Sequence, residues 1–198
     1  MNTRKLIKSC LLASIALVAA GLSAQEKKEP AKKEKPPPKK VVSIFEDKNL
    51  ERAVRKQVFA KRDNEAPLTA EDVRRISSVK GKEFGIKSLK GLEHCKELAS
   101  LELPGNEIKD LSPLKGLTRL QLIDLSGNKV ADTSPLQDLG ILQYLNLENN
   151  QVANLKPIGS IPSLRSLYLT GNQITDTAPL TKLIKLWSLY LGDNKIKD

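Results

Sequence analysis

The sequence is poor in the residue types that build disulfide frameworks, metal centres and aromatic cores. Its 198 residues include two cysteines, one histidine and one tryptophan, and aromatic residues make up 4% of the chain. Two cysteines are too few for a disulfide-rich fold, and a single histidine excludes a zinc site built from several histidines. Because aromatic residues are scarce, the core must consist mainly of aliphatic side chains.

Positive charge is in excess, but it is concentrated at the N-terminus. Of the formal net charge of +10, residues 1–24 contribute +3 and residues 25–40 contribute +4, which leaves +3 for residues 41–198. This remainder is nearly balanced, so the charge gives no indication of a nucleic-acid partner.

Residues 1–24 have the three parts of a secretory signal peptide. Three basic residues precede a short apolar stretch at residues 11–20, and small residues follow up to Ala24. The apolar stretch is shorter than the roughly 20 residues that span a bilayer, although an uncleaved anchor is the alternative. We expect cleavage after Ala24, which also removes Cys10. The protein is then exported without a membrane span, and is secreted, periplasmic or held at the cell surface.

Residues 25–40 are predicted to be a disordered linker. They contain seven lysines and four prolines and have no large apolar side chain to bury. The segment is either a solvated spacer or a basic tether to anionic material of the cell envelope.

An asparagine recurs every 22 residues in the second half of the chain. Each lies in the pattern L-x-x-L-x-L-x-x-N, which most units follow with a P-L turn, and the pattern is that of a leucine-rich repeat. The asparagines are Asn106, Asn128, Asn150, Asn172 and Asn194. The spacing predicts an α/β repeat solenoid, a curved structure with a parallel sheet on its concave face and short 3₁₀ turns on its convex face.

The recurring asparagines are predicted to form a structural ladder inside the solenoid. Their amides can pair with backbone groups that the tight turn after each strand leaves unsatisfied, at a cost of about 1–3 kcal/mol for each unpaired group. Aspartates recur four residues later and are expected to cap the convex turns, not to bind calcium. Ser112 and Ser134 are also expected to cap these turns, because each precedes a proline.

Residues 41–85 are predicted to be a helical N-terminal cap with a degenerate first repeat. Leu50, Val54 and Val58 are spaced by four and form one apolar stripe of a helix that Asp47 caps. Thr69 is expected to cap a second short helix that reaches Ile76.

Residues 86–198 are predicted to be the leucine-rich repeats, of which the last is incomplete. Cys95 occupies a leucine position of the repeat, so it is expected to be a buried packing residue. The last unit stops at Asp198 before its P-L turn, and an uncapped solenoid end is expected to associate with another chain.

The combination resembles the internalin-like leucine-rich repeat proteins of bacteria. The matching pieces are Phe45 with the helix after it, APLTAEDV at residues 66–73, IKSLKGLEHCKEL at residues 86–98, and the 22-residue units. The resemblance covers residues 41–198. It implies an exported, curved binding scaffold without catalytic activity.

The sequence contains no candidate catalytic or metal site. His94 stands at a repeat position that other units fill with glycine, aspartate, serine or lysine, so it is expected to lie at the surface. No nucleophile elbow or glycine-rich phosphate loop occurs. We therefore expect a protein that is not an enzyme and has no cofactor or metal.

The concave face carries the candidate ligand-binding residues. Tyrosine and tryptophan are enriched at binding hot spots. All three tyrosines are predicted to lie on the concave face, toward the end opposite its acidic residues. Tyrosine also favours strands, so these residues can equally be ordinary components of the sheet. The candidates are Glu102, Asp124, Tyr144, Asn146, Tyr168, Trp187 and Tyr190.

These observations predict that the concave face binds a protein partner. Envelope carbohydrate or peptidoglycan is one alternative, because tyrosine and tryptophan rings also stack on sugars. The other is a structural component that self-associates or assembles through the open C-terminal end.

Overall fold

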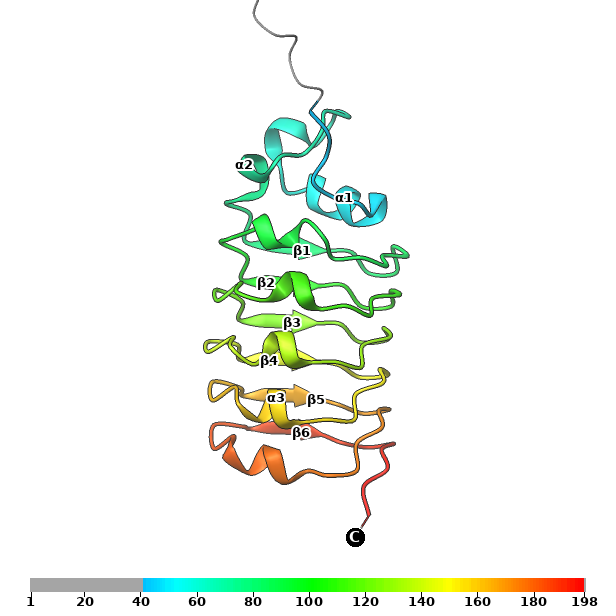
Figure 1. Ribbon diagram of the computed structural model, residues 1–198, viewed down its shortest axis with the longest axis vertical. Helices are drawn as coiled ribbons and strands as arrows, with labels where there is room; N and C mark the ends of the chain where they lie inside the picture. The colour runs from blue at the N-terminus through cyan, green and yellow to red at the C-terminus, as the bar shows by residue number, and fades with distance from the viewer. Residues whose placement is uncertain (1–40, 198) are drawn as a thin grey trace, which may run out of the picture. The chain divides into compact units, whose positions relative to one another are not determined.

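The computed structural model describes residues 41–197, which form a stack of coils around one core (Figure 1). The predicted signal peptide, the predicted linker and Asp198 lie outside the described residues. Within residues 41–197, no helix is both long and apolar enough to cross a bilayer.

Six short strands form one open parallel sheet in which strand order follows the sequence. Each strand from β1 to β5 pairs with the strand 22 residues later, beginning with Ser78 opposite Ser100. The strands are β1 (Ser78–Lys80), β2 (Ser100–Glu102), β3 (Leu122–Asp124), β4 (Tyr144–Asn146), β5 (Ser166–Tyr168) and β6 (Ser188–Tyr190). The predicted repeat and its register are confirmed.

A short helical turn crosses one side of the sheet in each coil (Figure 1). The turns are η2 (Leu92–His94), η3 (Ser112–Leu114), η4 (Ser134–Leu136), α3 (Lys156–Gly159) and η5 (Ala178–Lys182). Four are 3₁₀ turns as expected, but α3 is one turn of α-helix, closed by a bond of 2.8 Å from Gly159 N to Leu155 O. Glycine is required there, since a Cβ atom on Gly159 would stand 2.4 Å from the carbonyl oxygen of Pro179.

An aspartate side chain accepts from the first backbone N–H of η3, η4 and η5, and Asn154 does the same for α3. Asp110 Oδ1 accepts from Ser112 N at 2.8 Å, and the Ser112 hydroxyl donates to Asp110 Oδ2 at 2.8 Å. Asp132 and Ser134 repeat both bonds. The prediction that the serines cap the turns was therefore wrong, because each serine is already the first residue of its turn and its hydroxyl acts as a donor.

The core is aliphatic and fills the interior of every coil. The inward residues of β2 to β5, Leu101, Ile123, Leu145 and Leu167, are fully buried, and Cys95 belongs to the same buried core. Burial raises the pKa of the Cys95 thiol to about 12, so the thiol stays protonated. In β6, which has one neighbouring strand within residues 41–197, Leu189 is 42% exposed.

Three short helices cover the β1 end of the sheet: α1 (Lys48–Arg55), η1 (Phe59–Lys61) and α2 (Ala70–Val73). Asp47 caps α1 by accepting from Asn49 N at 2.8 Å, and its second oxygen accepts from Lys87 N at 2.7 Å. One carboxylate thus joins the helix to the first coil. Thr69 and Asp72 form the capping box of α2.

Helices α1 and α2 are shorter than the sequence indicates. Helix α1 ends at Arg55, so Val58 lies beyond it, although Val58 is buried with the rest of the predicted stripe. Helix α2 ends at Val73 and does not reach Ile76. A spacing of four between apolar residues therefore identified the buried side chains but not the helix ends.

Candidate binding face of the sheet

The outward side chains of the six strands form one surface, which we call the sheet face. Side chains alternate along a strand, so the central residue of each strand points into the core and the two outer residues point away from it. The sheet face consists of Ser78, Lys80, Ser100, Glu102, Leu122, Asp124, Tyr144, Asn146, Ser166, Tyr168, Ser188 and Tyr190.

Three tyrosines are in contact across the last three strands. The ring centroids of Tyr168 and Tyr190 are 4.8 Å apart with planes at 7°, and those of Tyr144 and Tyr168 are 5.3 Å apart with planes at 40°. Tyr168 and Tyr190 are direct partners in the register, whereas Tyr144 is diagonal to Tyr168. Leu122 lies opposite Tyr144. We call Leu122 and the three tyrosines the aromatic stripe; it crosses four strands obliquely.

The two predicted acidic residues have different surroundings. Glu102 Oε1 lies 3.0 Å from Lys80 Nζ and also accepts from the Ser100 hydroxyl, so its charge is neutralised. Asp124 Oδ1 accepts from Ser126 N at 3.0 Å, and no lysine or arginine among residues 41–197 lies within 4.0 Å of its carboxylate. Burial raises the pKa of the Tyr144 hydroxyl, and the negative charge of Asp124 raises it further.

Asn146 stands at an outward strand position, but its side chain is almost covered. It is 8% exposed, and its Oδ1 accepts from Glu148 N at 3.0 Å. The amide therefore stabilises the turn after β4. The sequence carried a signal for this role, since Asp124 occupies the same repeat position and both residue types form such turns with their own backbone.

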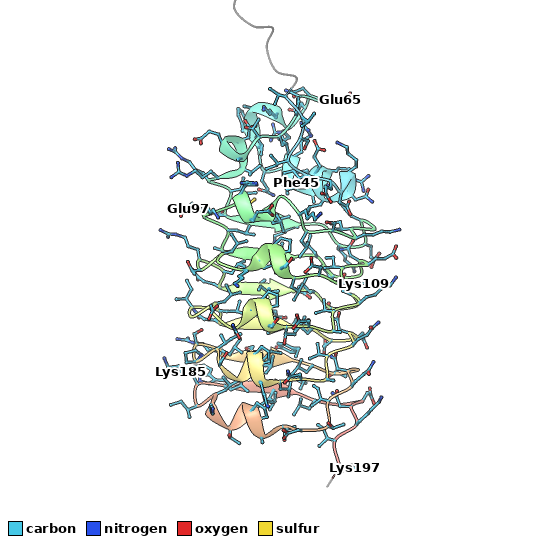
Figure 2. All side chains as sticks on the ribbon, in the orientation of Figure 1. Phe45, Glu65, Glu97, Lys109, Lys185 and Lys197 are labelled. Carbon is cyan, nitrogen blue, oxygen red and sulfur yellow. The ribbon has the colours of Figure 1, made fainter. Side chains whose placement is uncertain are left out.

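Trp187 lies beside the sheet face and not within it. It precedes β6 and is 85% exposed, and its ring centroid is 5.9 Å from Arg165 Cζ. Arg165 and Lys185 line a depression of about 300 Å³ on this flank. Figure 2 shows Glu97 and Lys185 projecting from the same flank. Sequence reasoning missed Arg165, which stands one repeat before Trp187.

The five repeat asparagines bind backbone groups of the preceding coil. Each Oδ1 accepts from the backbone N–H 20 residues earlier at 2.9–3.1 Å. Each Nδ2 donates to the carbonyl 25 residues earlier at 2.8–3.0 Å. Four of the five side chains are buried, and Asn194 is partly buried. These amides link the coils and are not free to contact a ligand.

No catalytic arrangement is evident in the described part of the chain. Across residues 41–197, no three histidine, cysteine, aspartate or glutamate side chains are grouped so that they could hold a metal ion. The side chain of His94 is 42% exposed, and its one acidic neighbour is Glu93 at 3.9 Å.

Comparison with known proteins agrees with this architecture. The family model described as "Leucine Rich repeats (2 copies)" matches residues 96–138, 142–182 and 162–198, about half of the chain. No curated protein sequence matches.

Solved structures from bacteria and a plant are similar. An internalin, InlF of Listeria monocytogenes, is 29% identical with a TM-score of 0.73, over 78% of this chain and 46% of the internalin. A leucine-rich repeat protein of Leptospira interrogans is 30% identical with a TM-score of 0.59, over 64% of this chain and 34% of that one. The plant peptide hormone receptor RGFR1, solved in complex with RGF2, is 25% identical with a TM-score of 0.51, over 55% of this chain and 19% of the receptor.

The chain therefore spans less than half the length of these three proteins. The resemblance to internalins is confirmed. Leucine-rich repeat proteins are typically scaffolds that present an extended surface to other proteins. The 22-residue register, the asparagine that bonds the preceding coil in each of five units and the match over half of the sequence show that this chain belongs to the leucine-rich repeat family.

Proposed function

We propose that this protein is exported and binds a protein partner through its sheet face, without catalysing a reaction. The observation that carries the proposal is the aromatic stripe. Tyr190 is 52% exposed, and the other members are partly buried and held in place by their neighbours. Large side chains that are already ordered lose little conformational entropy on binding, which is why such residues dominate protein interfaces.

The stacking of the tyrosines favours a protein ligand over a carbohydrate. A sugar ring binds against the face of an aromatic ring, but Tyr168 is flanked on both sides by other tyrosines, at 4.8 and 5.3 Å. The faces of Tyr168 are therefore less open to a sugar than its edge and hydroxyl group, which suit a mixed polar and apolar protein surface. The plant receptor, whose solved structure contains a bound peptide hormone, supports the same choice.

The test compares proteins retained by the immobilised wild-type chain and by two variants. The variant Tyr168→Ala, Tyr190→Ala removes the stacked pair. The control Ile141→Ala, Ile184→Ala removes exposed apolar side chains away from the sheet face. We expect a partner that binds wild type and control alike and binds the tyrosine variant at least about 30-fold more weakly, as hot-spot truncation predicts.

A partner that binds all three proteins alike would contradict the proposal, provided that circular dichroism shows all three folded. Retention of peptidoglycan fragments that depends on the tyrosines would support the carbohydrate alternative instead. Export is tested separately by the intact mass of the protein outside the cytoplasm, which we expect to begin at Gln25. A mass that includes Met1 would contradict export with cleavage.

A further inference from the structure

A negatively charged depression adjoins one end of the aromatic stripe. It has a volume of about 420 Å³ and lies along the turns that follow the first strands. Its lining includes the carboxylates of Glu83, Asp124 and Glu148 and the ammonium group of Lys82. Lys82 Nζ lies 3.5 Å from Glu83, which leaves Asp124 and Glu148 without a cation within 4.0 Å among residues 41–197.

Two consecutive repeats place glycine in the lining of the depression, where the neighbouring repeats have larger side chains. Gly105 and Gly127 have φ values of +67° and +65°, and Glu83 and Asn149 adopt the same left-handed conformation at this repeat position. A Cβ atom on Gly105 would stand 2.8 Å from Glu83 Cγ, so the Glu83 side chain lies over Gly105, while Asp124 and Glu148 line the same depression. A lysine or arginine side chain has the length and charge to enter this space.

The backbone of the sheet cannot recognise the ligand directly. The strand N–H and C=O groups between β1 and β6 are bonded to neighbouring strands, so a segment bound over the strands contacts their side chains. The stripe runs across the strands, and the serines beside it at Ser166 and Ser188 are small and polar. A peptide lying along the stripe therefore crosses the strands with its own backbone open to these hydroxyl groups.

The distance between the carboxylates and the stacked tyrosines sets how many residues separate the two peptide side chains that bind them. Asp124 and Glu148 belong to the coils of β3 and β4, whereas the stacked tyrosines belong to β5 and β6. These pairs are two strand spacings apart, or about 10 Å. An extended peptide advances about 3.1 Å per residue, so about three residues cover this distance.

We propose that the partner contributes an extended peptide with a lysine or arginine and, about three residues away, a proline or aromatic side chain. The cation enters the depression beside Asp124 and Glu148, and the ring packs on Tyr168 and Tyr190. This inference rests on the proposed function and specifies the chemistry of its ligand.

The test uses random twelve-residue peptides, displayed on phage and selected on the immobilised full chain. We expect the selected peptides to be enriched in lysine or arginine with proline or an aromatic residue three positions away. A synthetic copy of the most enriched peptide is then titrated with the wild-type chain and three variants. No enrichment, or a separation of about seven residues, which places two side chains 10 Å apart on a helix, would overturn the inference.

The first variant, Asp124→Asn with Glu148→Gln, removes both charges and keeps the Oδ1 acceptor that Ser126 N requires. We expect binding about 10-fold weaker and less sensitive to salt, because the charge pairs contribute modestly at a partly exposed site. The control, Glu97→Gln with Asp138→Asn, removes the same charge away from the sheet face, and its affinity should equal that of wild type.

The third variant, Tyr168→Ala with Tyr190→Ala, separates the two proposals. Peptides that lose affinity with this variant but not with the carboxylate variant would leave the proposed function standing and overturn the inference. Peptides that bind every variant alike would overturn both. Binding of peptidoglycan fragments that the carboxylate variant retains, without selection of any basic peptide, would also overturn the inference.

Discussion

Replacing Asn150 with alanine tests the link between neighbouring coils. Asn150 Oδ1 accepts from Val130 N at 2.9 Å, and its Nδ2 donates to Leu125 O at 2.9 Å and to Leu147 O at 3.1 Å. Each of these two carbonyls has a second donor, since Asn128 Nδ2 also bonds Leu125 O and Asn172 Nδ2 also bonds Leu147 O. Within residues 41–197, the Val130 N–H has no acceptor other than Asn150 Oδ1.

The destabilisation expected for Asn150→Ala follows from this difference between the carbonyls, which keep a second donor, and the Val130 N–H, which loses its acceptor. The buried Val130 N–H becomes unsatisfied, which costs about 1–3 kcal/mol, and loss of the two shared bonds adds about 0.5–1.5 kcal/mol each. We therefore expect a decrease of about 3 kcal/mol in the free energy of unfolding. At a urea m-value of about 2 kcal/mol/M, the denaturation midpoint falls by about 1.5 M.

The matched control is Gln151→Ala. The Gln151 side chain is exposed, and only its backbone N–H bonds the preceding coil, to Val130 O at 2.8 Å. This change should alter stability by less than about 0.5 kcal/mol. Hydrogen exchange shows which amide loses its bond. Asn150→Ala should speed exchange of the Val130 amide, whereas the Val152 amide should stay protected because it bonds Asn172. Equal midpoints, or exchange at Val152 in place of Val130, would refute the reasoning.

Three further predictions concern single buried or capping groups. Thr133→Val should raise the free energy of unfolding by about 1–2 kcal/mol, because the Thr133 hydroxyl is buried and has no hydrogen-bond partner among residues 41–197. Thr177→Val, at the same turn position but partly exposed, should change this free energy by less than about 0.5 kcal/mol. Urea denaturation that shows the opposite order would contradict this prediction. Cys95 should resist a thiol reagent at pH 8 until the protein unfolds, because burial raises its pKa to about 12; fast modification of the folded protein would disprove this. Burial raises the pKa of Asp47, but four backbone N–H groups lower it to a net value below its ordinary 3.8. The stabilisation from Asp47 is therefore complete above pH 4 and is lost as the pH falls through the folded-state pKa. Asp47→Ala should lower the free energy of unfolding by about 1–2 kcal/mol at pH 7 and by less in acid. If urea denaturation finds the same decrease at every pH, the role assigned to Asp47 is wrong.

The repeat period carried most of the information about the fold. A leucine-rich unit of fixed length dictates that Leu101 of one strand lies beside Ile123 of the next, and the register has this pairing. The same period places each repeat asparagine in the interior, where its amide has backbone partners. Each coil contacts only the coils before and after it. The partner of each strand is therefore always one repeat away, so the repeat length alone predicts the pairing.

Contacts that depend on side-chain direction were less accessible to sequence reasoning. The contact of Tyr144 with Tyr168 is diagonal, so it depends on ring orientation and not only on repeat position. The neutralisation of Glu102 requires Lys80, whose strand belongs to the degenerate first repeat. Helix α1 ends where Arg55 turns to donate to the carbonyls of Asn64 and Ala66, each at 2.9 Å, and these bonds lie outside the helical pattern.

The constant offset between paired strands has a consequence for how the number of repeats can change during evolution. An in-frame duplication of one 22-residue unit in the coding DNA would add a strand that already has the register of both of its neighbours, since every strand pair has the same offset. Unequal recombination can therefore lengthen or shorten the array in whole steps without rebuilding the core. A duplication that includes Tyr168 would extend the tyrosine stack by one ring and so lengthen the aromatic stripe.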